Sequence, residues 1–548
     1  MTTPIRRLLV ANRGEIARRV FATCRRLGIE TVAVHSDADA AMPFVGEADV
    51  AVRLPGDAPS ETYLRSDLIL DAARRTGADA VHPGYGFLSE NAEFARAVVD
   101  AGLVWVGPAP ESIEAMGSKI RAKELMRAAG IPVLEAPASP ATADLPLIVK
   151  ASAGGGGRGM RVVRDLDRLD DEIAAARAEA DSAFGDGTVF LERYVERGRH
   201  VEVQVVGHPD GILVLGERDC SIQRRHQKVV EESPAPRLPE RTRASLHEAA
   251  RAVAAAIDYR GAGTVEFLYD AGADRFFFLE MNTRLQVEHP VTELVHGVDL
   301  VELQLAVAEG RSPDPRTIGE TYGHAIEVRL YAEDPRTFLP QTGRLERLRL
   351  PEAIRVDQGV EEGDEVGLAY DPMIAKLIAH GETRDEALDR LAAALRETEV
   401  QGVVTNLPFL RWLVDHPELR AGRTTTAFLL EYPPLSPPRQ APSGPWRGGF
   451  RLNLPPPAPH SPPDEDSAAH AHRPGAEQSA VTAPMPGTVI RVLVTEGDPV
   501  QPRQPLVVLE AMKMETPLVS PYEGVVRSVH VREGDQVAGG TLLVELGE

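Results

Sequence analysis

The most informative stretch of this sequence is Ile148-Val-Lys150-Ala-Ser-Ala-Gly154-Gly-Gly-Gly157-Arg158-Gly-Met-Arg-Val-Val163, a glycine-rich loop between two short apolar strands. Glycines let backbone N–H groups wrap phosphate oxygens, and Lys150 and Arg158 add positive charge. The plain alternative is a flexible linker, but a linker rarely lies inside a hairpin with basic residues at its ends. The loop lacks the Gly-Lys-Ser/Thr ending of a P-loop and leads into a strand. The sequence therefore predicts a phosphate-binding hairpin that is not a P-loop.

On either side of this loop the 548-residue chain changes character, which predicts several domains because one core rarely serves so long a chain. Strands and helices alternate from Leu8 onward, and this pattern predicts a doubly wound parallel sheet. We expect an α/β domain at 1–118, mixed domains at 119–320 and 321–432, a Pro/Ala-rich linker at 433–480, and a small all-β domain at 481–548.

Composition and charge narrow the range of functions. The formal net charge of −22 would repel a phosphate backbone, so nucleic acid is not an expected partner. No apolar run approaches the roughly 18 residues of a membrane span. The two cysteines, Cys24 and Cys220, allow no disulfide framework and are expected to be buried in a protein of the reducing cytoplasm. Strand character begins at Leu8, so we expect no targeting peptide.

The run Glu280-Met-Asn-Thr-Arg-Leu-Gln-Val-Glu288 has a polar residue at every even position. An extended chain alternates its faces, so these five side chains are expected to share one face. A structural salt-bridge network would be one explanation. A metal site is favoured by Glu266, a further carboxylate among apolar residues, because Mg²⁺ takes one or two carboxylates plus phosphate oxygens. The expected roles are magnesium binding by Glu266, Glu280 and Asn282, anion binding by Arg284 and Gln286, and base catalysis by Glu288.

A third polar run, Gln223-Arg-Arg-His226-Gln-Lys228-Val-Val-Glu-Glu232, has two interpretations. It is either a solvated run of charges or an anion-binding edge in an otherwise acidic protein. Composition alone does not decide between them.

The C-terminal region contains an internal repeat. A shift of 37 residues (524 − 487) superimposes Gly487 on Gly524, Glu496-Gly-Asp498 on Glu533-Gly-Asp535, and Leu506 on Leu543. Each copy is predicted to form half of a small β sandwich or flattened barrel. Between the copies lies Glu510-Ala-Met-Lys-Met-Glu515, which places Lys513 at the tip of a hairpin on the pseudo-two-fold axis.

Together these motifs resemble those of a known family. Residues 1–432 resemble a biotin carboxylase with an ATP-grasp core, and 481–548 resemble a biotinyl carrier domain of the barrel-sandwich type. The whole chain is similar to the alpha subunit of an acyl-CoA carboxylase. The resemblance rests on five motifs: His82-Pro-Gly-Tyr-Gly-Phe-Leu-Ser-Glu-Asn91, the glycine loop, the run 223–232, the run 280–290, and Ala511-Met-Lys-Met514. In this family the ATP-grasp domain, here 119–320, carries a lid, here at about 132–202.

The resemblance implies an activity and a set of site residues. The enzyme would use ATP and bicarbonate to carboxylate biotin attached to Lys513, with magnesium or manganese as the metal. Lys228 would help Arg284, Gln286 and Val287 to seat bicarbonate, Glu288 would remove its proton, and Arg329 would stabilise the enolate of biotin. The residues implied to bind the nucleotide are Lys119, Lys150, Gly155, Gly156, Gly157, Glu192, Val195, His200, Gln223 and His226. Glu192 and Val195 would frame the adenine.

The resemblance also implies partners. These are bicarbonate, a separate carboxyltransferase (beta) subunit, a biotin protein ligase, and further copies of the chain in a homo-oligomer. The sequence does not name the acyl-CoA. Two other functions are weighed against this one. An ATP-grasp amide-forming ligase would leave Lys513 unused, and a non-catalytic biotin or lipoyl carrier would explain only 481–548. The methionines on both sides of Lys513 favour biotin over lipoate.

Overall fold

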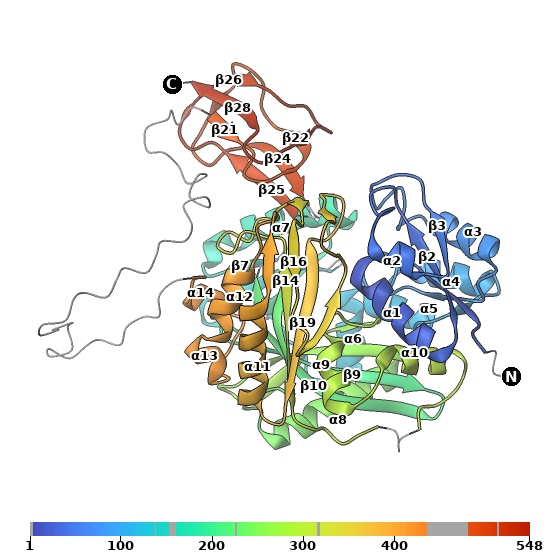
Figure 1. Cartoon of the computed structure of the whole chain (residues 1–548). Helices are drawn as coiled ribbons and strands as arrows, with labels where there is room; N and C mark the ends of the chain where they lie inside the picture. Colours follow the sequence, from blue (N-terminus) through green and yellow to red (C-terminus); the bar gives the residue numbers. More distant parts are fainter. Residues whose placement is uncertain are drawn as a thin grey trace, which may run out of the picture. The chain divides into compact units, whose positions relative to one another are not determined.

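The computed structural model describes residues 4–435 and 480–547, except 138, 153–159, 225–226, 315–317 and 512–513. The side chains of 182–184, 511 and 514–515 are not described. The chain divides into two compact units, Met1–Leu435 and Ser436–Glu548 (Figure 1). Within the described residues, no helix combines the length and the apolar character that a membrane span needs.

The N-terminal part folds around the five-stranded parallel sheet that the alternation of strands and helices predicted. The strand order is β3-β2-β1-β4-β5. Leu8 and Val10 pack with residues of α1, whereas Leu9 packs with residues of α3 and α4, so helices cover both faces (Figure 1). The elements are β1 (Arg7–Val10), α1 (Gly14–Leu27), β2 (Glu30–His35), α2 (Pro43–Glu47), β3 (Val50–Arg53), α3 (Ser66–Thr76), β4 (Ala80–His82), α4 (Ala92–Asp100), β5 (Val104–Trp105) and α5 (Pro110–Gly117).

The hairpin predicted around the glycine loop is present. Strand β6 (Leu147–Ala151) pairs antiparallel with β7 (Arg161–Val163) on one side and with β8 (Val189–Arg193) on the other. Helix α7 (Leu169–Phe184) packs on this small sheet through Ala176. The loop residues 153–159 lie outside the described residues.

An eight-stranded sheet forms the centre of the first unit, in the order β13-β12-β9-β10-β11-β14-β19-β17. It runs across the boundary expected near residue 320, because β11 pairs antiparallel with β14. Its strands are β9 (Arg199–His208), β10 (Gly211–Arg224), β11 (Gln227–Ser233), β12 (Gly261–Asp270), β13 (Arg275–Asn282), β14 (His324–Tyr331), β17 (Arg355–Gln358) and β19 (Met373–Gly381).

Helices cover this sheet from several parts of the chain. Helix α8 (Glu240–Ala256) contributes Leu246 and Val253 to the core beneath β9 and β12, and α11 (Arg384–Glu397) contributes Leu388 and Leu391 to the core beneath β14 and β19. The remaining elements are α6 (Lys119–Ala128), α9 (His289–His296), α10 (Leu300–Ala308), β15 (Gly343–Arg344), β16 (Arg347–Arg349), β18 (Glu365–Val366), β20 (Glu399–Gln401), α12 (Leu407–Val414), α13 (Pro417–Arg420) and α14 (Phe428–Glu431).

Both cysteines are free and buried, as expected. Burial raises the pKa of the Cys24 thiol to about 12. A thiol with so high a pKa is inert, which agrees with a packing role.

The second unit shows the predicted repeat in its strands. Its two four-stranded sheets have the orders β21-β28-β26-β23 and β25-β24-β22-β27, and the 37-residue shift carries one onto the other. The strands are β21 (Ala480–Thr482), β22 (Gly487–Val492), β23 (Pro499–Val500), β24 (Pro505–Ala511), β25 (Met514–Val519), β26 (Gly524–Val529), β27 (Gln536–Val537) and β28 (Leu542–Gly547). Strands β24 and β25 pair up to Ala511 and Met514, which confirms the hairpin; Lys513 lies outside the described residues.

The repeat extends to the turns. The amide of Gly497 donates to the Val526 carbonyl at 2.8 Å, and the equivalent amide of Gly534 donates to the Val489 carbonyl at 2.7 Å. Gly497 and Gly534 have φ of 91° and 93°, values that favour glycine. Each copy therefore holds the turn of the other, and neither half can form its core alone.

This symmetry predicts equal effects of equivalent core mutations. Leu506 and Leu543 are equivalent and fully buried, so changing either to alanine should lower the unfolding free energy of this unit by about 2–5 kcal/mol. Amide hydrogen exchange of peptides from 480–547 in the whole chain measures the loss. Leu493, which is 47% exposed, is the control, since Leu493→Ala should change stability by less than about 0.5 kcal/mol. Losses at the two buried leucines that differ by more than about 2 kcal/mol would contradict symmetric packing.

Candidate active site

The candidate site is built on a lysine, 13% exposed in its side chain, that is held by three carboxylates. The Nζ atom of Lys228, on β11, lies 2.5 Å from Glu202, 2.8 Å from Glu266 and 2.6 Å from Glu288. Burial lowers the pKa of Lys228, but the three carboxylates outweigh it and hold this pKa well above its usual range. Lys228 is therefore not part of a solvated run of charges, and anion binding by the run 223–232 stays a prediction.

Arg329 clamps Glu288 from the other side. Its guanidinium, on β14, donates to Oε2 of Glu288 at 2.9 Å and to Glu231 at 2.7 Å. The ammonium of Lys228 donates to the other oxygen of Glu288, Oε1. Glu288 is fully buried. Burial raises the pKa of this carboxyl, but Lys228, Arg329 and Arg218 outweigh burial and hold it well below its usual range. The candidate base is thus an ionised carboxylate with a cation on each oxygen.

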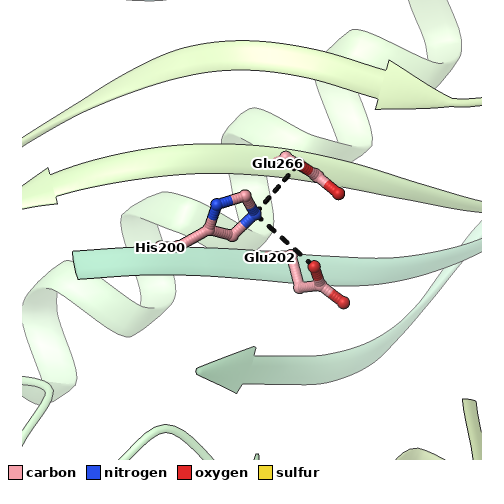
Figure 2. A group of neighbouring side chains, drawn as sticks. All are labelled: His200, Glu202 and Glu266. Atoms are coloured by element: carbon pink, nitrogen blue, oxygen red, sulfur yellow. Dashed lines mark ion pairs between the residues drawn. The ribbon is translucent and has the colours of Figure 1, made fainter. Parts of the chain in front are cut away.

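His200 forms the opposite wall of the cluster. Its Nε2 lies 2.9 Å from Glu266 and 3.7 Å from Glu202, and Figure 2 shows the ring directed between these two carboxylates. Its Nδ1 lies 3.1 Å from the amide nitrogen of Gln223. Burial alone would lower the pKa of His200, but the Glu266 carboxylate raises it. A protonated imidazole here would add a further cation to the cluster.

The run 280–288 converges on the cluster, but not as an extended strand. Strand β13 ends at Asn282, and the chain turns before α9 begins at His289. The expectation of one extended face is therefore wrong beyond Asn282. Hydrogen bonds between side chains, rather than strand alternation, bring the groups together: Arg284 donates to Asn282 at 3.1 Å and to Gln286 at 3.0 Å. Glu280 lies on β13 before the turn, and its side chain is 37% exposed.

The residues expected to bind magnesium are neighbours across two strands. Glu266 on β12 pairs directly with Glu280 on β13, and the side-chain amide of Asn282 donates to Glu266 at 2.8 Å. Two carboxylates and an amide are the oxygen donors that Mg²⁺ or Mn²⁺ prefers, so this set fits such an ion. Lys119 lies 3.6 Å from Glu280. A phosphate-bearing ligand and a metal would therefore meet at one place.

The small sheet β7-β6-β8 carries the second expected phosphate-binding lysine. Lys150 on β6 lies 2.7 Å from Glu192 on β8. Burial lowers the pKa of Lys150 to about 8, against the opposing effect of Glu280. The Glu192 carboxylate is fully buried between Lys150 and Lys123, so it orders these lysines. An adenine-framing role for Glu192 and for the half-buried Val195 stays a prediction.

Several expected site residues have no described position. These are Gly155, Gly156 and Gly157 of the glycine loop, His226, and Lys513. Their roles stay predictions from the sequence. Val287, by contrast, is placed in the turn beside Glu288, where its backbone carbonyl accepts from Lys376 at 3.0 Å.

The structure adds residues that sequence reasoning missed. Glu202 accepts from both Lys228 and Arg218, and Arg218 is fully buried. Glu231 fixes Arg329. A signal for Glu202 was present, because His200-Val-Glu-Val-Gln204 alternates polar and apolar residues like the start of the run at 280. Glu231 has no such signal, since it lies beside Glu232 in a run of charges.

Comparison with known proteins agrees with this geometry. Residues 4–113 match the family model "Biotin carboxylase, N-terminal domain", 119–314 match "Carbamoyl-phosphate synthase L chain, ATP binding domain", 327–431 match "Biotin carboxylase C-terminal domain", and 479–546 match "Biotin-requiring enzyme". The biotin carboxylase of Halalkalibacterium halodurans is 49% identical over 443 residues, which is 78% of this chain and 98% of that protein.

Two further relatives extend the match. The biotin-dependent acyl-coenzyme A carboxylase alpha3 subunit of Mycobacterium leprae is 41% identical over 594 residues, covering 99% of this chain and 98% of that subunit. The biotin carboxylase domain of Hydrogenobacter thermophilus 2-oxoglutarate carboxylase was solved with MgADP, ADP and bicarbonate. It matches with a TM-score of 0.75 and 41% identity, over 79% of this chain and 98% of that domain.

The buried Glu231 predicts a pH effect on stability. Burial raises its pKa from 4.5 to about 7, against the opposing effect of Arg329. Between these values the folded protein keeps a proton that the unfolded chain releases, so the contribution of Glu231 to stability falls as pH rises. From pH 5 to pH 7, wild type should lose about 2 kcal/mol of unfolding free energy relative to Glu231→Gln, measured by urea unfolding.

The control is the neighbouring carboxyl of Glu232. Its pKa is lowered, because contacts with His324 and Arg384 outweigh burial. Relative to Glu232→Gln, wild-type stability should therefore stay nearly constant from pH 5 to pH 7. A constant difference for Glu231→Gln as well would show that Glu231 is ionised throughout this range.

Proposed function

Because the chain belongs to the family of biotin carboxylases and biotin-dependent acyl-CoA carboxylase alpha subunits, and is therefore an ATP-dependent biotin carboxylase, we propose that the buried cluster around Glu288 is its reaction centre. Its cofactors are biotin and Mg²⁺, and its nucleotide substrate is ATP. The observation that supports this placement best is the doubly clamped Glu288, which lies beside the metal-binding carboxylates. The acceptor is biotin on Lys513 of the same chain.

We assign bicarbonate to the turn between Asn282 and α9. Arg284 offers a planar guanidinium and Gln286 an amide, which suit a small planar anion. In the structure both oxygens of Glu288 accept hydrogen bonds from cations, Lys228 and Arg329. These hydrogen bonds make Glu288 a poor proton acceptor. A bound anion competes for Lys228, and this competition frees one oxygen of Glu288 and raises its basicity. The base would thus be activated by the substrate whose proton it removes.

We assign the ATP phosphates to Lys119, Lys150, His200 and the glycine loop. Lys119 and Lys150 approach from two sides, and their mutual repulsion is offset when anionic phosphates bind. Glu266, Glu280 and Asn282 would hold the metal. When bound, Mg²⁺ neutralises charge on the phosphate oxygens. Gln223 lies beside His200 and orients the imidazole.

Arg329 is assigned to the biotin step. Its guanidinium is buried and held in place by Glu231 and Glu288. A fixed positive charge in a buried site stabilises negative charge that develops on a substrate oxygen, without reorganisation. This pre-orientation is the contribution of the protein to the second half of the reaction.

The partners follow from the family. A carboxyltransferase accepts the carboxyl group, and we propose that it is a separate beta subunit that passes the group to an acyl-CoA. A biotin protein ligase would modify Lys513, and the carboxylase unit would act as a homo-oligomer. Residues 433–480 would serve as the tether between the carboxylase parts at 1–432 and the carrier at 481–548. The free, buried cysteines fit a reducing cytoplasm.

The first test concerns Lys513. Wild type should hydrolyse ATP only when bicarbonate is present and should bind streptavidin. Lys513→Arg should lose all streptavidin binding and the matching mass increment, yet keep bicarbonate-dependent ATP hydrolysis and the carboxylation of free biotin. Streptavidin binding by Lys513→Arg would show that another residue carries biotin, and wild type without bicarbonate-dependent hydrolysis would refute the proposed reaction.

The second test separates the two half-reactions. Loss of one fixed donor to a developing oxyanion costs about 10²–10³ in rate. Arg329→Ser should therefore lower biotin carboxylation by that factor, while bicarbonate-dependent ATP hydrolysis, measured without biotin, stays within about ten-fold of wild type. An equal collapse of both activities in a folded variant would place Arg329 in bicarbonate or nucleotide binding instead.

A further inference from the structure

Lysine is rare in this chain, and its positions are informative. Of the 60 basic residues only six are lysines, so arginine supplies the positive charge almost everywhere. Five of them are accounted for: Lys119, Lys150, Lys228 and Lys513 belong to the proposed site, and Lys123 pairs with Glu192. The sixth, Lys376, has no part in the reaction as assigned above. A lysine ammonium is more compact than an arginine guanidinium and fits different spaces. We therefore ask why a lysine, rather than an arginine, occupies position 376.

Lys376 is fully buried on β19 and donates to the turn that carries Glu288. Its Nζ atom lies 3.0 Å from the backbone carbonyl oxygen of Val287, 3.2 Å from Glu15 and 3.5 Å from Asp357. Lysine is almost never fully buried unless it is paired. Here burial acts to lower the pKa of Lys376, but Glu15, Asp357 and Glu327 outweigh it and raise the pKa. The ammonium is therefore charged and committed to these partners.

These contacts tie three distant segments together. Glu15 belongs to α1, Val287 to the turn before α9, and Lys376 to β19. The same oxygen of Glu15, Oε1, also accepts from the hydroxyl of Tyr85, whose backbone carbonyl oxygen accepts from Asn12 at 2.7 Å. The order of contacts is thus Tyr85, Glu15, Lys376 and the Val287 carbonyl.

The same N-terminal motif also holds the beginning of the turn. Glu90 accepts from the backbone amide of Thr283 at 3.1 Å and from Arg284 at 2.9 Å. Tyr85 and Glu90 both belong to the run His82–Asn91, which the reaction as assigned leaves without a role. The run therefore braces the turn at both ends, directly at Thr283 and through Glu15 and Lys376 at Val287.

We propose that Lys376 is a positioning residue for bicarbonate: it holds the Val287 carbonyl, and thereby the Gln286–Glu288 turn, in the geometry that the anion needs. This inference rests on the proposed function of that turn. A hydrogen bond from a buried ammonium fixes the direction of the Val287 carbonyl. The peptide bond that contains this carbonyl, and the residues that it joins, are then fixed as well. Lys376 touches neither substrate, and it acts through the turn alone.

The test compares Lys376→Met with Arg384→Met. Arg384 is the matched control, because it also joins a buried carboxylate, that of Glu232, to backbone carbonyls, those of Leu419 and Arg420, away from the turn. A small displacement of a binding group is costly, so Lys376→Met should raise the KM for bicarbonate by about 10- to 100-fold. The KM for ATP should stay within about three-fold of wild type, and Arg384→Met should change neither constant by more than that.

A second variant separates positioning from folding. Lys376→Met leaves Glu15 without its cation, so Glu15→Gln/Lys376→Met should recover thermal stability. It should not recover the KM for bicarbonate. Recovery of both, or an unchanged bicarbonate KM in Lys376→Met, would overturn the proposal.

Hydrogen exchange gives a readout that does not depend on activity. Amides of the peptide 283–289 should exchange faster in Lys376→Met than in wild type, and should be unchanged in Arg384→Met. If wild type shows no bicarbonate-dependent hydrolysis but the exchange differs as expected, the proposed function fails while the bracing of the turn stands. If the exchange is the same in all three proteins, Lys376 does not position the turn.

Discussion

The arrangement of the first unit depends on one constraint, which is that Glu288 stays ionised without contact with water. Burying an ion costs several kcal/mol, and this cost is met only where partners lie in good geometry. Glu288 has two such partners, Lys228 and Arg329, on the neighbouring strands β11 and β14. Lys228 has a further carboxylate in Glu202, and the carboxyl group of Glu231 accepts from Arg329. Removing any one partner of such a pair would leave a buried charge uncompensated, at about 3–5 kcal/mol.

This balance bears on how the proposed site would receive two anionic substrates and a metal. The buried carboxylates and cations neutralise one another, so the protein presents little free positive charge to ATP and bicarbonate. Each arriving anion must displace a carboxylate from a cation, or bring a cation with it. Glu266 illustrates the second case, since Lys228 and His200 now contact the carboxylate that would hold the metal ion. The charges of the ligands therefore complete a network that already exists, rather than fill an empty cationic pocket.

Sequence patterns predicted the parts of this structure that local geometry decides. The parallel N-terminal sheet, the hairpin around the glycine loop and the 37-residue repeat all follow from periods of apolar residues and from turn glycines. The same logic failed after Asn282, because the side chains of Arg284 and Gln286 reach the cluster from a turn. Glu231 and Lys376 were missed for a different reason. Their partners, Arg329 and Val287, are distant in the sequence, and no local period reports such contacts.

The pairing of β11 with β14 has a consequence for the integrity of the unit. Both strands are interior members of one eight-stranded sheet, although they lie on opposite sides of the boundary expected near residue 320. A chain cut at that boundary would expose the backbone N–H and C=O groups of β11 as a free edge. Free edges recruit other strands, including those of misfolded copies. The central and C-terminal regions are therefore separate in sequence pattern but inseparable as folding units, and proteolysis between them would lead to aggregation rather than to two soluble fragments.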